Sequence, residues 1–168
     1  FNMKINGGQY AWKPIIIQEV SKETNDFVLY CDAGNIIDKR LTWVRKIIDR
    51  DGIYCPTSSG TVKDWTHVGM LDYYRFSNRY LRYKNLNAAV IGFDPNSLKI
   101  AQLLDEWADC ALTQKCIAPE GSSRENHRFD QSALTLLAYR IGLVKRTRST
   151  YLNQIWEPIG LRIQQDVD

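Results

Sequence analysis

Two clusters of polar residues in this sequence are of types that can act on sugars and phosphates. The first is Asp32-Ala33-Gly34, which directly follows an apolar run. A carboxylate beyond the carboxyl end of a buried strand can hold a cation or a ribose hydroxyl. The second is the hexapeptide 127–132, His-Arg-Phe-Asp-Gln-Ser, which combines an imidazole, a guanidinium, a carboxylate and an amide. Turn chemistry and helix N-capping are the structural alternatives for these two clusters.

Two tryptophans stand beside a cation or an imidazole, in Trp12-Lys13-Pro14 and in Trp65-Thr66-His67. Aromatic faces commonly contact sugar rings, and lysine is a common partner of phosphate. Trp12, Trp65 and His67 are therefore candidates for contact with a sugar, and Lys13 is a candidate for contact with a phosphate. The structural alternative is that the tryptophans belong to the core and that His67 caps a helix.

The elements that must position these residues follow from the apolar pattern. Pro14 is suited to the first turn of a helix. The run 27–31 predicts a buried strand that ends at Asp32, and 87–93 predicts another buried strand. The polar residues 94–97 then cap a long helix, with Leu98, Ala101, Leu104, Ala108 and Leu112 on its inner face.

The remaining segments complete an alternation of strands and helices. Apolar residues at helical spacing predict a helix from Leu41 to Ile48, which Gly52 ends, and 53–55 predicts a short strand. The turn-rich segment 56–64 and the segment 116–126 are predicted as loops, and 129–141 as a final helix. This order predicts an α/β fold with a central sheet flanked by helices, in a single domain over 1–168.

Composition excludes several classes of protein. With 44% hydrophobic residues, the 168-residue chain is expected to fold, and 22 basic against 19 acidic residues do not indicate a nucleic-acid binder. No apolar run approaches the roughly 20 residues that span a bilayer. The P-loop, the dinucleotide-binding glycine motif and the serine-hydrolase elbow are absent from the sequence.

Taken in order along the chain, these motifs resemble one family. The series runs from Gly7-Gly8 and Trp12-Lys13-Pro14 through Asp32-Ala33-Gly34 and Trp65-Thr66-His67 to the hexapeptide 127–132, with Glu106-Trp107 between the last two. It resembles nucleotide-diphospho-sugar glycosyltransferases with the GT-A fold. The resemblance covers about residues 7–140, and the first tryptophan motif and the hexapeptide are its specific parts.

The resemblance implies a GT-A-like domain with a mixed central sheet and a role for each matching residue. Asp130 and Gln131 match the catalytic pair that faces the acceptor and the anomeric carbon. Lys13, Asp32, Gly34 and Arg128 would lie at the donor diphosphate. Trp12, Trp65 and His67 would contact the acceptor. The implied partners are a nucleotide-diphosphate sugar and a glycan or other hydroxyl acceptor.

A divalent metal, manganese or magnesium, is implied as well, with Asp32 and His127 as its candidate ligands. Gly34 stands where the family has its second acid. Only 31 residues precede Asp32, whereas βαβ units need roughly 30 or more residues each. We therefore expect the nucleotide-binding half to be abbreviated or partly absent.

Other functions and locations remain open at this point. One alternative is an inactive relative that binds carbohydrate or protein, and another is a hydrolase that uses Asp32 and Asp130. Cys110 and Cys116 flank a short segment and could pair, which would favour a secretory lumen. The Golgi lumen is favoured for a eukaryotic source, with a membrane anchor upstream of Phe1, and the cytoplasm for a bacterial or viral source.

Overall fold

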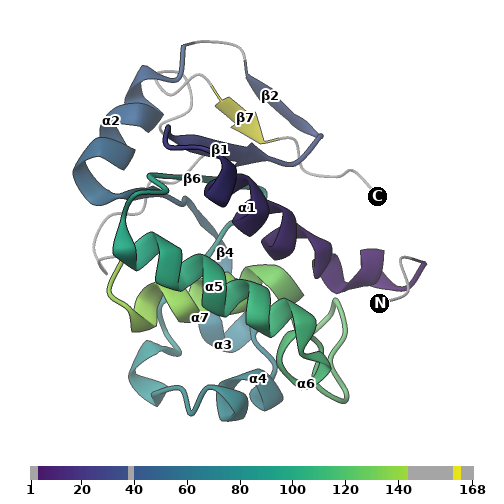
Figure 1. The fold of residues 1–168 in the computed structure, drawn as a ribbon. Helices are drawn as coiled ribbons and strands as arrows, with labels where there is room; N and C mark the ends of the chain where they lie inside the picture. The colour runs from purple at the N-terminus through teal and green to yellow at the C-terminus, as the bar shows by residue number, and fades with distance from the viewer. Residues whose placement is uncertain (1–3, 38–39, 144–160, 164–168) are drawn as a thin grey trace.

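The computed structural model describes residues 4–37, 40–143 and 161–163, which form helices and small antiparallel sheets (Figure 1). The α-helices are α1 (Trp12–Glu23), α2 (Thr42–Asp51), α3 (Val62–Trp65), α4 (Val68–Tyr73), α5 (Leu98–Leu112), α6 (Gln114–Ile117) and α7 (Phe129–Arg140). The strands are β1 (Val28–Cys31), β2 (Asn35–Ile37), β3 (Ile53–Tyr54), β4 (Thr57–Thr61), β5 (Lys84–Leu86), β6 (Val90–Phe93) and β7 (Leu161–Ile163). Two short 3₁₀ segments, η1 (Asn6–Tyr10) and η2 (Asn78–Tyr80), complete the set. The prediction of mixed helix and strand content is confirmed.

The largest sheet has three strands in the order β1-β6-β3, and β6 pairs antiparallel with both neighbours. The prediction of a mixed sheet is therefore wrong for the described residues, whose strand pairs are all antiparallel. This direction matters because it brings the carboxyl end of β1 beside the amino end of β6. The backbone N–H of Asp32 accordingly donates to the carbonyl of Ala89 at 2.8 Å. Ala89 lies in a turn, which replaces the first part of the strand predicted over 87–93.

Strand β6 is buried on both of its faces. Val90 packs with Val44 and Ile48 of α2, whereas Ile91 and Phe93 belong to the main core on the other face. Between them, Gly92 allows α2 to approach closely, because a Cβ there would lie 2.8 Å from Cδ1 of Ile48. The sheet thus lies between α2 and the layer that contains α5.

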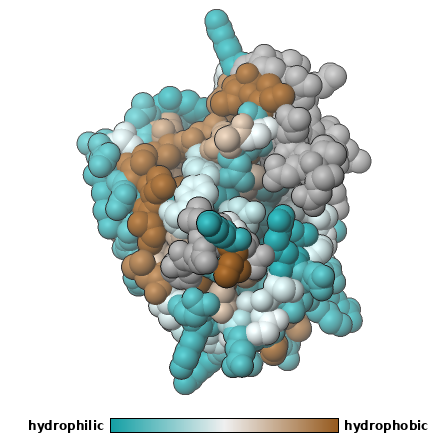
Figure 2. Space-filling view, turned by 90° about the vertical axis from the view of Figure 1, so that its right-hand side faces the viewer, coloured by the Kyte–Doolittle hydropathy of each residue, from teal (hydrophilic) through white to brown (hydrophobic). Residues whose placement is uncertain are grey.

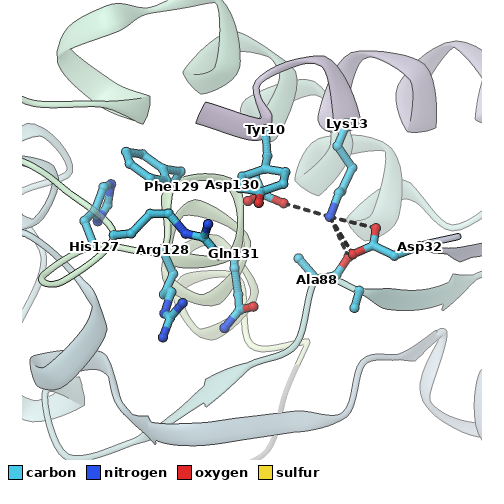
Figure 3. A pocket seen from close by; sticks show the side chains of 11 residues that line it. Tyr10, Lys13, Asp32, Ala88, His127, Arg128, Phe129, Asp130 and Gln131 are labelled. Carbon is cyan, nitrogen blue, oxygen red and sulfur yellow. Dashed lines mark hydrogen bonds and ion pairs between the residues drawn. The ribbon is translucent and has the colours of Figure 1, made fainter. Parts of the chain in front are cut away.

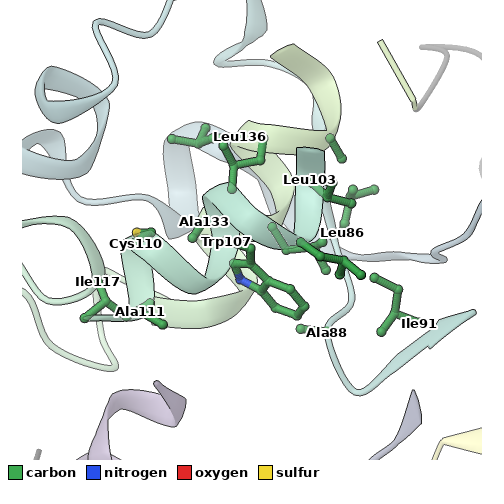
Figure 4. Packing of buried hydrophobic residues seen from close by; sticks show 14 of the residues in the cluster. Leu86, Ala88, Ile91, Leu103, Trp107, Cys110, Ala111, Ile117, Ala133 and Leu136 are labelled. Atoms are coloured by element: carbon green, nitrogen blue, oxygen red, sulfur yellow. The ribbon is translucent and has the colours of Figure 1, made fainter. Parts of the chain in front are cut away.

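Helix α5 packs against both α1 and α7, and Trp107 at its centre is fully buried (Figures 1 and 4). The predicted inner face of α5 is only partly right. Leu104 and Ala108 are buried, but Ala101 is exposed, and Leu98 and Leu112 are 88% and 71% exposed. The face that packs is defined by Trp107 and its neighbours one turn away, since burial of the largest apolar side chain stabilises the fold most.

The segment predicted as a loop over 56–64 instead forms β4 and the start of α3. Strand β4 pairs with β5, and such pairing can impose a strand on a polar sequence. Thr61 and Asp64 form a capping box that starts α3. In the second predicted loop, Cys116 lies in α6 and forms the anticipated disulfide with Cys110.

Figure 2 shows one face of the molecule, on which apolar residues form a brown band along the left side. On α1, the side chains of Trp12, Ile16 and Val20 are exposed at a spacing of four residues. Among the described residues, no helix combines the length and hydropathy that crossing a membrane would require.

Candidate functional site

An open pocket of about 150 Å³ lies where the start of α1, the end of β1, the turn before β6 and the start of α7 meet (Figure 3). It is lined by Tyr10, Lys13, Asp32, Ala88, Ala89, Arg124, His127, Arg128, Phe129, Asp130 and Gln131. Pockets that enclose a drug-sized ligand are typically about 300–1,000 Å³. This pocket therefore has room for only part of a molecule as large as a nucleotide sugar.

The Lys13 ammonium lies between two carboxylates. Its Nζ is 2.9 Å from Oδ1 of Asp32 and 3.3 Å from Oδ2 of Asp130, and it donates to the carbonyl of Ala88 at 3.3 Å. Lys13 is 3% exposed, and burial by itself lowers the pKa of an ammonium group. The negative charges of Asp130 and Asp32 outweigh burial, so the pKa of Lys13 is raised.

Asp32 is held from a second side by Tyr30, whose hydroxyl donates to Oδ1 at 2.6 Å. Because side chains two residues apart on a strand share a face, β1 itself brings Tyr30 and Asp32 together. Burial, together with this bond to Asp32, raises the pKa of Tyr30 far above its ordinary value. The phenol therefore stays protonated and acts as a donor.

Asp130 lies in the first turn of α7 and is 3% exposed. Its backbone carbonyl accepts a hydrogen bond of 2.8 Å from Nε1 of Trp107. Its Oδ2 has no hydrogen-bond partner among the described residues, because the contact with Lys13 is an ion pair outside hydrogen-bond geometry. Burial raises the pKa of Asp130 to about 6, and the charge of Lys13 opposes that rise. This side chain can take up or release a proton near neutral pH.

The raised pKa of Asp130 predicts a pH-dependent stability. Between about pH 4 and pH 6 the folded state binds this proton more tightly than the unfolded state, so raising the pH through this window destabilises the fold. A change from 3.8 to about 6 corresponds to about 3 kcal/mol. We expect wild type to lose up to this amount of unfolding free energy relative to Asp130→Asn as the pH rises, because Asn does not titrate. Urea unfolding of both proteins across the window measures it, and a constant difference would contradict the assignment.

His127 is buried and uses both ring nitrogens. Nε2 lies 3.1 Å from the carbonyl of Ile117, and Nδ1 accepts the backbone N–H of His67 at 3.2 Å. Burial lowers the pKa of His127 to about 4, so the ring is neutral at neutral pH. In this arrangement His127 connects the chain before α7 to α6 and to the start of α4.

The divalent metal implied by the resemblance does not fit this arrangement of side chains. Both nitrogens of His127 are engaged, and both oxygens of Asp32 contact the Lys13 ammonium. A metal at Asp32 would have to displace Lys13, which is itself buried. We therefore derive no chemical step through a metal.

Backbone strain concentrates at the pocket. Four consecutive residues, Gly7 to Tyr10, have positive φ angles of 55–65°, and Phe129 has a φ of 43°. Such angles are unfavourable for residues with a Cβ, and persistent strain of this kind clusters at functional sites. Phe129 is buried against the same core as Leu134 and Leu137, so it anchors the first turn of α7 beside the pocket.

The structure brings together Lys13, Asp32, His127, Arg128, Asp130 and Gln131, all of which were predicted as site residues. Of the other four, Trp12 and Gly34 are exposed outside the pocket lining. Trp65 lies outside the pocket lining, with its ring centroid 4.0 Å from the Arg128 guanidinium, and the backbone N–H of His67 donates to Nδ1 of His127, which lines the pocket.

Sequence reasoning missed three polar side chains of the site, Tyr10, Tyr30 and Arg124. Arg124 lies three residues before the hexapeptide, and Tyr30 lies two residues before Asp32 on a strand. The period of two along a strand was a usable signal for Tyr30. Tyr10 reaches the pocket through the left-handed backbone after Gly7-Gly8, which simple periodicity does not describe.

Comparison with protein-family models, with curated proteins and with solved structures finds no match to this chain.

Proposed function

We propose that this chain is a glycosyltransferase domain of the GT-A type, which moves a sugar from a nucleotide-diphosphate donor to a hydroxyl acceptor. The observation that carries the proposal is the buried Asp130 carboxylate in a pocket that Arg128 also lines. The two side chains come from one turn of chain and supply opposite functions. A carboxylate can accept a proton, and a guanidinium can bind a phosphate.

The proposed reaction needs a base on one side of the anomeric carbon and positive charge on the other. The acceptor oxygen forms a bond to the anomeric carbon, its proton passes to Asp130, and the diphosphate leaves with the electron pair of the broken C–O bond. A pKa of about 6 leaves Asp130 ionised above that pH and able to take the proton. Gln131, whose amide both donates and accepts, is suited to contact a sugar hydroxyl.

The leaving diphosphate is assigned to Arg124 and Arg128. Neither guanidinium has an ion-pair partner among the described residues, and Arg128 is stacked on Trp65. Burial lowers the pKa of Arg128, and the positive charge of Arg124 lowers it further. Two like charges therefore lie close together, without an acid between them among the described residues. Fixed positive charges of this kind stabilise a leaving group as its charge develops.

We predict that Arg124→Ala and Arg128→Ala each weaken the binding of inorganic pyrophosphate by about tenfold or more. Isothermal titration calorimetry measures the affinities. Arg82→Ala is the matched control, because Arg82 is exposed and lies outside the pocket lining. Equal affinities for wild type and both pocket variants would remove the arginines from the diphosphate site.

The activity itself is tested by incubating the protein with nucleotide-diphosphate sugars and a panel of glycan acceptors. Acceptor-dependent release of the nucleoside diphosphate supports the proposal. Carbohydrate binding without release supports the alternative of an inactive relative. Cleavage of a glycoside with no nucleotide present indicates a hydrolase that uses Asp32 and Asp130. Either of the last two results overturns the proposed transfer.

A further inference from the structure

We propose that the Lys13 ammonium is a built-in cation, which occupies the position that a divalent metal would take between Asp32 and Asp130. The inference goes beyond the proposed function, because it concerns the charge of the site and holds whether or not a sugar is transferred. Figure 3 shows the ammonium between the two carboxylates, with Ala88 close by.

The atoms around Nζ are those of a metal site. The two oxygens of Asp32 lie at 2.9 and 3.3 Å, and Oδ2 of Asp130 and the carbonyl of Ala88 each lie at 3.3 Å. Carboxylate and carbonyl oxygens are the ligands that hard divalent cations take in proteins. An ammonium group has three donors and no acceptor. It donates to Asp32 and to Ala88 and attracts Asp130 by its charge, at distances longer than a metal–oxygen bond.

Burial holds Lys13 in this position. The side chains of Lys13 and Asp130 are 4% and 5% exposed, and the rings of Tyr10 and Tyr30 each lie 5.4 Å from Nζ. Contacts with ring faces at this distance favour a cation. If the ammonium moved out, the buried carboxylate of Asp130 would remain near Asp32 without a counter-charge, which is strongly unfavourable.

A consequence is that Lys13 is not the group that binds the donor phosphates, because two carboxylates already neutralise its charge. That role remains with Arg124 and Arg128, which have no acidic partner among the described residues. The pocket thus separates a lysine held by two carboxylates from a pair of guanidinium groups without ion-pair partners.

The test is to titrate manganese into the protein in the absence of any substrate. Wild type is expected to bind no manganese at this site, so its melting temperature stays unchanged. Lys13→Ala vacates the position and leaves the surrounding oxygens, so it is expected to bind one manganese ion per chain and to melt a few degrees higher in its presence. The double variant Lys13→Ala/Asp32→Asn is the matched control and should lose this binding.

Two outcomes would overturn the inference. One is manganese binding by wild type that Asp32→Asn abolishes, since the metal would then share the site with Lys13 in place. The other is a folded Lys13→Ala protein that binds no manganese. If Lys13→Ala does not fold, the comparison of wild type with Asp32→Asn still decides the question. The proposed transfer is judged separately, because none of these measurements requires activity.

Discussion

Asp130→Asn is expected to lower the rate of sugar transfer by roughly 10²–10⁴-fold while the protein remains folded. Asn has nearly the same shape as Asp, and the hydrogen bond from Trp107 goes to the backbone carbonyl of residue 130, so the start of α7 is retained. The lost function is the capacity to accept the acceptor's proton. Stability should not fall with the rate, because the substitution removes a carboxylate whose ionised form is disfavoured by burial.

The measurement is turnover per folded molecule, with the melting temperature recorded for each protein. Asp72→Asn is the control, since Asp72 is an exposed carboxylate on α4 outside the pocket lining. In wild type, the rate should rise with pH through about 6, as Asp130 becomes ionised, and this rise should be absent from the variant. An Asp130→Asn protein with the full rate would show that this side chain is not the base.

Trp107→Ala should destabilise the fold by about 3–5 kcal/mol. Trp107 is fully buried where α5 meets α7, and it lies near Leu86, Ala88 and Ala133 in the same core (Figure 4). Removing the indole leaves a cavity and also leaves the Asp130 carbonyl without its donor. Urea unfolding gives the change in free energy.

Trp107→Phe separates the two contributions. A phenyl ring fills much of the space but cannot donate, so this variant should lose about 0.5–1.5 kcal/mol from the hydrogen bond to the Asp130 carbonyl, in addition to a small packing loss. Leu112→Ala, on the same helix but 71% exposed, should change stability by no more than about 0.5 kcal/mol. If Trp107→Ala and Leu112→Ala had similar effects, Trp107 would not be the centre of the core.

Much of the local structure follows from the sequence alone. Proline in the first turn, Gly52 after the last turn and apolar residues at helical spacing predicted the helices that became α1, α2, α5 and α7. The run before Asp32 predicted β1, which is half-buried in the structure. The final helix predicted over 129–141 begins at Phe129 in the structure as well. These features are encoded within a few residues of chain, so they can be predicted from periodicity and capping.

Long-range placement was decided only by the tertiary structure. The ion pairs of Lys13 with Asp32 and Asp130 join three segments that are distant in the chain. They form because the antiparallel pairing of β1 with β6 brings the turn at Ala88 beside the starts of α1 and α7. His127 could be read as a metal ligand from its neighbours in sequence, but packing against α6 and the start of α4 engages both of its nitrogens. A residue's type and its neighbours in the chain determine which chemistry its side chain can perform. The groups that surround the side chain in the folded core determine its charge and which of its atoms are available to a ligand, because burial and through-space contacts set both.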